Sequence, residues 1–329
     1  MLLPKKNTQA TTLLLCHHGI GDVIQYIPFI YNVCKSTQNN IVITVKSNLE
    51  KQVLLSSICT LKKATIITRK DIYKLLFMRL NIREAFSIGI AHKKTKLLFK
   101  LLGVSKQYFC HPYLYDKPEN FPEFDATVFN SNQQHKVEVS KELFETVYKK
   151  AFTMPDFPWL NGSSSSLKKK IVIHPGCGKT ETKKRWPIRH YNDLISLIIK
   201  ETNFTIIIVG GPDDLELKDQ LSNTSPNVLN KIGDLSLLET TQTIQDATLV
   251  LGSDSGLLHI AAALKKNVLC LFGPTDENIT APYGDHVTIL NKHVNCGPCY
   301  FSKSWDNCEN NVCLKLITPK EVLKKIKEI

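Results

Sequence analysis

Short apolar runs followed by polar, glycine-containing turns recur along the chain, with helical patterns between them. The runs lie at residues 11–16, 41–45, 64–68, 171–174, 204–209, 248–251 and 267–272. Apolar runs of this length, bounded by turn residues, are typical of buried parallel strands, and the helical patterns between them are typical of crossover helices. The pattern predicts an α/β protein whose ligands bind at the carboxyl ends of the strands.

Residues 154–170 (MPDFPWLNGSSSSLKKK) interrupt this pattern. Two prolines, an Asn-Gly pair and four serines are typical of a flexible connection and not of a core element. The 329 residues are enough for two hydrophobic cores of ordinary size. We therefore expect two domains, residues 1–165 and residues 166–329, without an internal sequence repeat.

The first half offers one glycine turn and a basic stretch. The turn HHGIGD at residues 17–22 precedes a helix expected from about Asp22 toward Val33, and Pro28 should kink or shorten that helix. The turn is a weak match to the dinucleotide fingerprint because it lacks the third glycine. Residues 107–135 are expected to be mainly loop, and residues 136–151 a helix.

Residues 71–106 interleave apolar residues at helical spacing with lysine and arginine. Two interpretations stay open. Core helices with a solvated basic face give this pattern, and so does a surface that lies on anionic lipid or receives a phosphorylated lipid acceptor.

The second half carries glycine turns after four of its predicted strands, at residues 175–180, 210–213, 252–256 and 273–276. The turn at 252–256 leads into a helix, whose free N–H groups and positive dipole end suit a diphosphate. The alternative is that Ser253, Asp254 and Ser255 only cap a structural helix. Asp213 and Asp214 favour a helix start over a metal site.

Several of these motifs resemble those of the heptosyltransferase-like glycosyltransferases, glycosyltransferase family 9. They are GSDSGLLHIAAAL followed by LFGPTDENITAPYG, the KRWP motif at 184–187, and Gly21-Asp22 followed by Pro28. The resemblance covers residues 170–329 well and the first half only through its turn. It implies a GT-B fold, with two Rossmann-like domains whose parallel sheets face a central cleft. The N-terminal domain would bind the acceptor and the C-terminal domain the nucleotide sugar.

The activity implied by the resemblance is inverting transfer of a sugar, heptose from ADP-heptose, to a lipopolysaccharide-core-type acceptor. Asp22 would be the general base, although a helix-capping role for its carboxylate is compatible with that function. Lys184 would hold the departing diphosphate. The implied donor-binding residues are Gly176, Thr180, Gly211, Asp254, Ser255, Gly256, Leu257 and His259. On the acceptor side the resemblance implies Gly21 and His18.

Two of the remaining side chains have a structural alternative. As a lone helix histidine, His259 could equally be a packed, hydrogen-bonded residue. Trp186 is expected to pack between structural elements and not to stack on a ligand. The motifs require no catalytic cofactor or metal.

Cys296, Cys299, Cys308 and Cys313 lie within eighteen residues. The first pair has metal-ligand spacing, but the later spacings match no standard zinc finger. Structural zinc or iron, reduced structural thiols and disulfides all stay open. In each case loss of the cluster should affect folding before chemistry.

The net charge of +12 is uneven: residues 1–165 carry 22 Lys+Arg and 12 Asp+Glu, whereas residues 166–329 carry 20 and 18. The basic half implies an anionic partner, unless it is an ordinary solvated surface. We expect a lipid-linked oligosaccharide acceptor and peripheral contact with the inner membrane, and no nucleic acid. The first apolar run is too short for a signal peptide and no window suggests a membrane span, so we expect a cytoplasmic protein with mostly reduced cysteines.

Three other function classes remain. One is a glycosyltransferase of the same fold with another nucleotide sugar or a protein acceptor. An NAD-dependent oxidoreductase would need a fuller glycine fingerprint with an acidic residue about 20 positions further on. A non-catalytic nucleotide- or nucleic-acid-binding protein would explain the basic half but would leave Asp22 dispensable.

Overall fold

Two compact units make up the chain, residues 1–159 and residues 160–329. The computed structural model describes residues 9–57, 64–89, 93–111, 123–130, 133–155, 169–221, 225–300 and 302–329.

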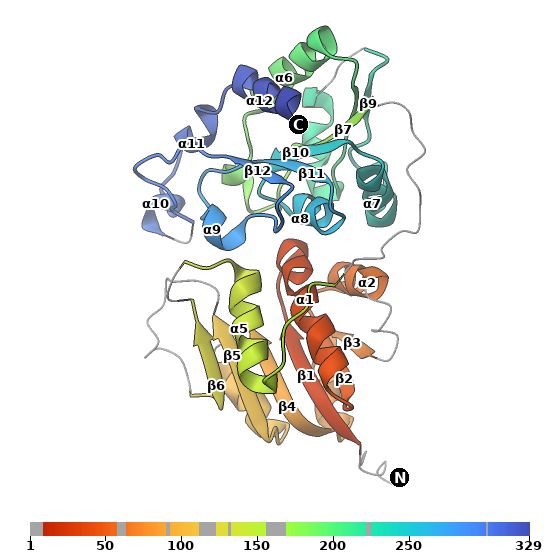
Figure 1. Cartoon of the computed structure of the whole chain (residues 1–329), viewed down its shortest axis with the longest axis vertical. Coiled ribbons are helices and arrows are strands. Elements are labelled where there is room, and N and C mark those ends of the chain that lie inside the picture. The colour runs from red at the N-terminus through yellow and green to blue at the C-terminus, as the bar shows by residue number, and fades with distance from the viewer. Residues whose placement is uncertain are drawn as a thin grey trace. The chain divides into compact units, whose positions relative to one another are not determined.

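Unit 1 alternates strands and helices almost throughout (Figure 1). Its elements are β1 (Ala10–Cys16), α1 (Ile20–Ser36), β2 (Asn40–Val45), α2 (Asn48–Ser57), β3 (Ala64–Thr68), the 3₁₀ turn η2 (Arg69–Asp71), α3 (Lys74–Phe77), β4 (Asn81–Ile88), α4 (Lys93–Leu101), β5 (Lys106–His111), β6 (Ala126–Phe129) and α5 (Lys136–Tyr148).

Unit 2 repeats the alternation and ends in several short helices. Its elements are β7 (Lys170–His174), η4 (Thr182–Lys184), α6 (Ile188–Glu201), β8 (Thr205–Ile208), η5 (Pro212–Leu217), η6 (Asp219–Leu221), β9 (Val228–Asn230), α7 (Leu237–Gln245), β10 (Leu249–Ser253), α8 (Gly256–Ala263), β11 (Asn267–Leu271), α9 (Glu277–Thr280), β12 (Val287–Leu290), α10 (Lys303–Asp306), α11 (Val312–Lys315) and α12 (Pro319–Glu328).

Each unit contains one sheet of six strands, and every neighbouring pair is parallel. The order in unit 1 is β3-β2-β1-β4-β5-β6. The order in unit 2, taken from its β9 edge, is β9-β8-β7-β10-β11-β12, which is the same arrangement. In each sheet the order reverses beside the first strand, and ligands of such folds bind at that point, at the carboxyl ends of the strands.

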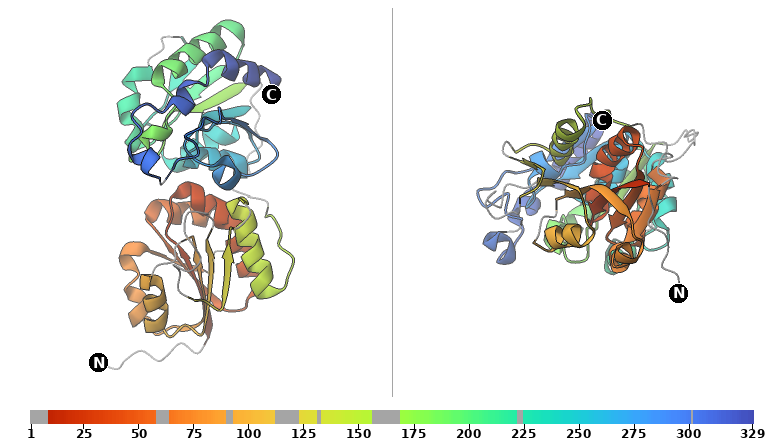
Figure 2. Two further views of the ribbon diagram at one scale, coloured as in Figure 1. Left: turned by 90° about the vertical axis from the view of Figure 1, so that its left-hand side faces the viewer. Right: turned by 90° about the horizontal axis from the view of Figure 1, so that it is seen from below.

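Helices cover both faces of the sheet in unit 1. Leu75 of α3 and Phe99 of α4 are buried against one face, in a cluster with Leu13, Leu15 and Ile82 of the strands. Helix α5 packs beside α1, and in the left view of Figure 2 α5 lies on the opposite side of the sheet from the orange α3 and α4. The sheet is therefore buried on both faces, as parallel sheets require.

The core of unit 2 lies between its sheet and the helices α6 and α12. Trp186, fully buried just before α6, donates its indole N–H to the carbonyl of Ile317 at 2.9 Å and meets the ring of Tyr191 edge-on. This confirms that Trp186 packs within the protein. Thr318 caps α12 by accepting from the backbone N–H of Glu321.

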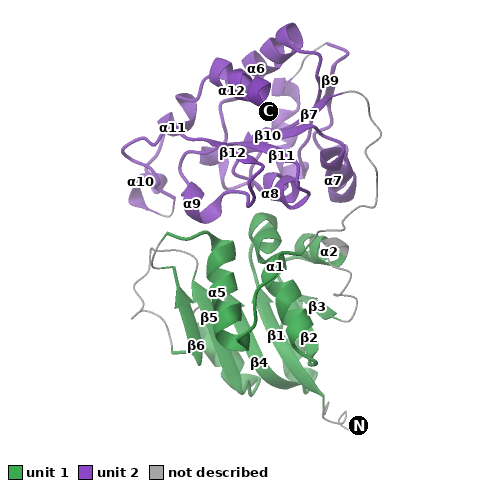
Figure 3. Cartoon of the chain, viewed as in Figure 1, with its two compact units in different colours: residues 1–159 green, residues 160–329 purple. Residues whose placement is uncertain are grey.

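The chain passes from unit 1 to unit 2 between residues 159 and 160, in a stretch that the structure does not describe (Figure 3). The predicted boundary at residues 165–166 therefore lies outside the described residues. Within those residues, no helix is long and apolar enough to span a membrane.

Three strands lie wholly or mainly in stretches for which the sequence pattern predicted helix or loop. Strand β4 lies inside residues 71–106, and β6 with most of β5 lies inside residues 107–135. The last four residues of β4, Ala85 to Ile88, are all buried. A strand covered on both faces shows no alternation of apolar and polar residues, so periodicity alone does not distinguish it from a buried helix.

Pro28 does not shorten the first helix. Helix α1 runs without interruption from Ile20 to Ser36, with Pro28 buried in its middle. Proline removes one backbone donor from a helix, and the carbonyl of Pro28 itself accepts from the side-chain amide of Asn32 at 2.8 Å. The long buried stretch of α1 holds the helix on the sheet across the proline.

Candidate active site

In unit 1 the predicted base lies at the carboxyl end of the central strand. Asp22 is in the first turn of α1, and about a quarter of its side chain is exposed. Its Oδ1 forms a short ion pair with Nζ of Lys136, and its Oδ2 lies 3.8 Å from Nδ1 of His18. Gly21 precedes Asp22 in the same turn. The structure thus brings the sequence-predicted residues Asp22, His18 and Gly21 together.

Lys136 is the partner that the sequence did not indicate. It begins α5, far from Asp22 in the chain, and its side chain is 4% exposed. A buried ammonium is costly unless it is paired, so the contact with Asp22 compensates its burial. An adjacent ammonium also favours the ionised form of a carboxylate, which is the form that a general base needs.

His18 is fixed by the backbone of β4. Its Nε2 lies 2.6 Å from the carbonyl oxygen of Ile88, so this nitrogen carries a proton and donates. Gly89 adopts φ +72°, and a Cβ there would come within 2.8 Å of the imidazole of His18. Glycine at position 89 therefore leaves the room in which the ring lies against Asp22.

In unit 2 the central group is a cation. Lys184, at the end of η4, has Nζ 3.4 Å from Oδ2 of Asp254 and 3.2 Å from Oε2 of Glu181. The same ammonium lies 4.2 Å from the ring centroid of Tyr300. Burial alone would lower the pKa of Lys184, but the carboxylates of Asp254 and Glu181 and the nearby Tyr300 hydroxyl raise it above its usual range. The lysine is fully charged.

The polar turn before α8 does more than cap that helix. Ser255 occupies the N-cap position, yet its side chain makes no capping hydrogen bond. The hydroxyl of Ser253 accepts from the backbone N–H of Trp186 at 3.1 Å. Asp254 faces Lys184, and its Oδ1 lies 3.5 Å from Nε2 of His259. The alternative that these three residues only cap a helix is therefore wrong.

Three buried polar atoms beside this turn have no hydrogen-bond partner among the described residues: Ser255 Oγ, His259 Nδ1 and Thr275 Oγ1. The exposed fractions of these residues are 9%, 6% and 2%. Buried polar atoms usually have partners, and those without one are often completed by a ligand or water. They come from the turn before α8, from α8 and from the turn after β11.

Gly256 and Leu257 begin α8, where the first N–H groups of a helix have no acceptor within it. Both residues are partly exposed. Gly252, just before them, has no room for a side chain, because a Cβ would lie 2.4 Å from the carbonyl oxygen of His174. The start of α8 can therefore receive an anion.

The two predicted donor-binding glycines differ: Gly176 lies against the carboxylate of Asp214, whereas a Cβ on Gly211 would meet no atom within 4 Å. A Cβ on Gly176 would lie 2.0 Å from Oδ1 of Asp214, and the N–H of Gly211 donates to Oδ2 of Asp214 at 3.0 Å. Asp214 also lies 3.6 Å from Nη2 of Arg185. This arrangement confirms that Asp214 belongs to a helix start, at η5. Thr180 is exposed, and among the described residues the partners of the Lys184 ammonium are Asp254, Glu181 and Tyr300, not Thr180.

The cysteine-rich segment packs against the stretch of chain that contains Lys183 and Lys184. The backbone N–H of Tyr300 donates to the carbonyl of Pro274 at 2.9 Å. Its ring meets that of Trp305 edge-on. Lys183 donates to the carbonyl oxygens of Trp305 and Asp306 at 2.7 and 2.9 Å. The segment thus fixes both lysines and places an aromatic face against the second.

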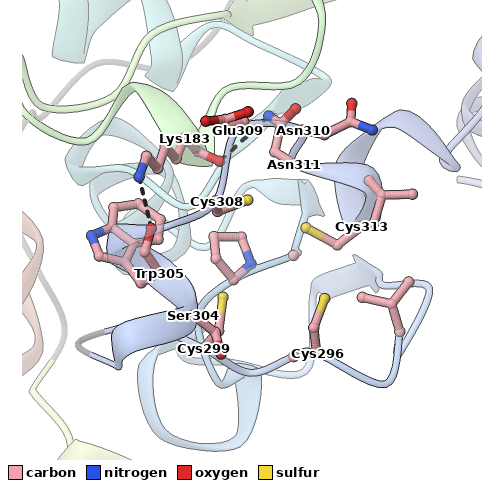
Figure 4. Close-up of a pocket in the computed structure, with 15 residues that line it drawn as sticks. Lys183, Cys296, Cys299, Ser304, Trp305, Cys308, Glu309, Asn310, Asn311 and Cys313 are labelled. Atoms are coloured by element: carbon pink, nitrogen blue, oxygen red, sulfur yellow. Dashed lines mark hydrogen bonds between the residues drawn. The ribbon is translucent and has the colours of Figure 1, made fainter.

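Four thiols line one cavity of about 270 Å³ beside this segment (Figure 4). They belong to Cys296, Cys299, Cys308 and Cys313, and none forms a disulfide in the part of the chain that the structure describes. Burial, together with the neighbouring thiols, raises the pKa of Cys313 to about 11. In this arrangement no three described His, Cys, Asp or Glu side chains are placed to hold a metal ion.

Four residues at these sites were not predicted as site residues from the sequence: Lys136, Glu181, Tyr300 and Thr275. Three of them lie within or next to motifs that the sequence did single out, since Tyr300 follows Cys299, Glu181 follows the turn at 175–180 and Thr275 belongs to the turn at 273–276. Lys136 had no such signal, because its partner Asp22 lies 114 residues away.

The two units place opposite charges at corresponding ends of their sheets. Unit 1 presents a carboxylate beside an ammonium, which suits removal of a proton from a hydroxyl. Unit 2 presents an ammonium and a helix start, which suit a diphosphate. Two Rossmann-like units of this kind define the GT-B class of fold, as the sequence predicted.

Comparisons with known proteins agree. The chain belongs to glycosyltransferase family 9 (heptosyltransferase), whose family model matches residues 35–308. It is 33% identical over 112 residues to lipooligosaccharide heptosyltransferase 2 of Haemophilus influenzae, an alignment that spans 32% of each chain. The matched part is thus about a third of that relative's length.

Two comparisons span nearly the whole chain. One is with lipooligosaccharide heptosyltransferase 2 of Campylobacter jejuni, at 21% identity over 94% of this chain and 96% of that one. The other is with the structure of ADP-heptose lipopolysaccharide heptosyltransferase II of Escherichia coli. It gives a TM-score of 0.70 at 19% identity and covers 97% of this chain and 98% of that one. The predicted family and fold class are confirmed.

Proposed function

We propose that this protein transfers heptose from ADP-heptose, with inversion, to a lipid-linked acceptor of the lipopolysaccharide-core type. Membership in the heptosyltransferase family supports the reaction class. The observation that carries the assignment to this chain is the buried Lys184, held between Asp254 and Glu181 in the same unit as the start of α8 and its unpartnered polar atoms. A dianionic diphosphate fits such a group.

In the proposed step, Asp22 accepts the proton of an acceptor hydroxyl while the hydroxyl oxygen forms a bond to the anomeric carbon of heptose. The bond from that carbon to the diphosphate oxygen breaks, and ADP leaves with the electron pair. Lys184 and the N–H groups at the start of α8 stabilise the negative charge that develops on the diphosphate. Attack and departure on opposite faces of the anomeric carbon invert its configuration.

Diphosphate binding would replace contacts that Lys184 already makes. Its ammonium is shared by Asp254 and Glu181, and three anionic groups cannot all be close to one cation without repulsion. We infer that Glu181, the more exposed of the two carboxylates, withdraws when the donor binds. Asp254 keeps a second partner in His259.

The proposed partners are the nucleotide sugar and an anionic, lipid-linked oligosaccharide. We place the reaction at the cytoplasmic face of the inner membrane with peripheral contact. The excess of positive charge in residues 1–165 supports an anionic acceptor and membrane surface.

The four-cysteine cavity is the one place for which we propose a structural metal ion, zinc or iron. Four thiols around one cavity support it, although the thiols would have to move closer together to bind an ion in tetrahedral geometry. Metal analysis of the purified protein, with Cys299→Ser and Cys313→Ser as comparisons, tests this. A metal content near zero in the wild type, with unchanged thermal stability in a chelator, would contradict it.

Calorimetric titration at two salt concentrations separates the proposed function from its rivals. The protein should bind ADP and ADP-heptose, and Lys184→Met should weaken that binding. NAD or single-stranded RNA binding in preference to ADP would indicate an oxidoreductase or a nucleic-acid-binding protein instead. A strong salt dependence is expected for RNA and a weak one for the enclosed diphosphate.

A further inference from the structure

The outward side of α3 and α4 in unit 1 combines exposed apolar side chains with lysines. Leu76 and Phe77 in α3 are 46% and 72% exposed, and Leu97 and Leu101 in α4 are 56% and 63% exposed. We call these four side chains, together with Lys93, Lys94 and Lys100, the α3–α4 face. Both helices pack their inner sides on one face of the sheet, so their outer sides belong to one side of the unit (Figure 2).

Helix α4 shows the division most clearly. Thr95 and Phe99, four residues apart, are buried against the sheet. Leu97 and Leu101 are also four residues apart, and helical geometry places them together on the opposite side. A core helix with a solvated basic face, the other interpretation of this sequence, would direct its leucines inward. The exposed pair therefore needs another explanation.

The charge around these leucines is strongly positive. Residues 69–106 contain ten Lys+Arg and two Asp+Glu, which accounts for most of the net charge of the chain. Asp71 pairs with Lys74 at 2.7 Å, and Glu84 accepts from Tyr148 of α5. Within the described residues, no carboxylate pairs with Lys93, Lys94 or Lys100.

We propose that the α3–α4 face docks this protein on an anionic phospholipid bilayer. The lysines would lie among the headgroup phosphates, and Phe77, Leu97 and Leu101 would enter the interfacial layer, where leucine and aromatic side chains gain from leaving water. Nucleic acid offers phosphates but no comparable apolar layer for the leucines. The biological purpose of this docking rests on the proposed function, because a lipid-linked acceptor lies in a bilayer.

Vesicle flotation with the full chain tests the docking without any turnover. The vesicles are phosphatidylcholine alone, or phosphatidylcholine with about 30% phosphatidylglycerol, in low salt. The charge variant is Lys93→Glu with Lys94→Glu and Lys100→Glu, and the apolar variant is Leu97→Ser with Leu101→Ser. The matched control is Lys200→Glu with Lys320→Glu and Lys324→Glu, which makes the same charge change at exposed lysines of α6 and α12 in unit 2. Circular dichroism confirms that each variant is folded.

We expect the wild type and the matched control to float with the anionic vesicles only. The charge variant should bind at least about tenfold more weakly, since each lysine near an anionic surface contributes about 1 kcal/mol. The apolar variant should bind several-fold more weakly. Equal binding by the charge variant and the control, binding that does not depend on anionic lipid, or a preference for single-stranded RNA over vesicles would each overturn the proposal.

Two acceptor forms separate this inference from the proposed function. Both α3–α4 variants should transfer sugar to a deacylated, water-soluble acceptor at the wild-type rate. With acceptor in anionic vesicles, their rate should fall in proportion to their weaker binding. If no protein transfers sugar to either acceptor while the vesicle results stand, the proposed reaction is wrong and the docking surface is right.

Discussion

The charged groups of the two units differ in which kind of side chain is central: a carboxylate in unit 1 and an ammonium in unit 2. In unit 1 one carboxylate, Asp22, lies beside the ammonium of Lys136 and the imidazole of His18. In unit 2 one ammonium, Lys184, lies between the carboxylates of Asp254 and Glu181. Each central group follows the first strand of its sheet, β1 or β7, in sheets of identical strand order. The same topology thus places a carboxylate at the centre of one group and an ammonium at the centre of the other.

This difference indicates which chemical step each charged group suits. A carboxylate beside an ammonium suits the removal of a proton from a hydroxyl. In the proposed donor complex, a lysine with two carboxylate partners would exchange one of them for a phosphate.

The largest effect should come from Asp22→Asn. The amide has almost the same shape but cannot accept the proton of the acceptor hydroxyl, so the turnover number should fall by about 10³-fold. The affinity for ADP, measured by calorimetry, should stay within about twofold of the wild type. A variant with full turnover would show that Asp22 is not the base.

Lys184→Met should act on the other half of the reaction. Loss of a cation that stabilises the leaving group should lower the turnover number by about 10²-fold. Unlike Asp22→Asn, it should also weaken ADP binding by at least about tenfold. Lys183→Met is the control, because Lys183 donates to backbone carbonyls and faces Trp305. Equal losses in the two variants would contradict a specific role for Lys184.

Lys136→Met should lower turnover by about tenfold and the free energy of unfolding by about 2 kcal/mol, because it leaves Asp22 without its buried partner. Lys136→Arg keeps the charge and should restore most of the turnover. Stopped-flow rates and urea unfolding measure the two effects separately. Loss of stability without loss of turnover would limit Lys136 to a structural role.

Tyr300→Leu tests the aromatic face beside Lys184. Removal of a cation–π contact at 4.2 Å should weaken ADP binding about fivefold. Tyr300→Phe keeps the ring and should bind within about twofold of the wild type. If Tyr300→Phe is as weak as Tyr300→Leu, the hydroxyl and not the ring is responsible.

A histidine near the end of the first strand of each unit makes stability depend on pH. Burial lowers the pKa of His17 to about 4, with Arg69 and His18 contributing, and burial likewise lowers the pKa of His174. An unfolded histidine takes up a proton near pH 6.5, so between about pH 6.5 and 4 the unfolded state binds more protons than the folded state. The free energy of unfolding should fall as the pH decreases through this window.

The variant His17→Gln isolates that contribution. Glutamine can keep the hydrogen bond that His17 Nε2 makes with the hydroxyl of Thr44 at 2.7 Å, but it does not titrate. The difference between wild type and variant in urea unfolding should change by about 2 kcal/mol between about pH 7 and pH 4.5. A constant difference across this range would contradict the role of His17.

The sequence predicted most strands and the residues of both charged groups that lie in motifs. Asp22, Lys184 and Asp254 lie in short motifs near glycine turns, and such motifs are visible in the sequence alone. The pairing of Lys136 with Asp22 could not be predicted from a local motif. It forms only because the fold brings α5 to the first turn of α1. Strand β4 was missed for a related reason, because burial on both faces removes its periodicity.

A glycine turn after a strand does not by itself indicate a ligand-binding glycine. Gly176 follows a strand, as ligand-binding glycines do, but here it makes room for the carboxylate of Asp214, to which the N–H of Gly211 donates. The pattern of a glycine turn is the same whether the neighbour is a ligand or a buried side chain of the same unit. Only the tertiary structure distinguishes the two cases.

Release of nucleoside diphosphate from a panel of nucleotide sugars is the most direct test of the central claim that this protein is an ADP-heptose-dependent transferase. The panel contains ADP-heptose, ADP-glucose, UDP-glucose and GDP-mannose, each with and without a lipopolysaccharide-core acceptor. We expect ADP release from ADP-heptose that requires the acceptor and is lost in Asp22→Asn. Release from none of the four, or release that Asp22→Asn leaves unchanged, would contradict it.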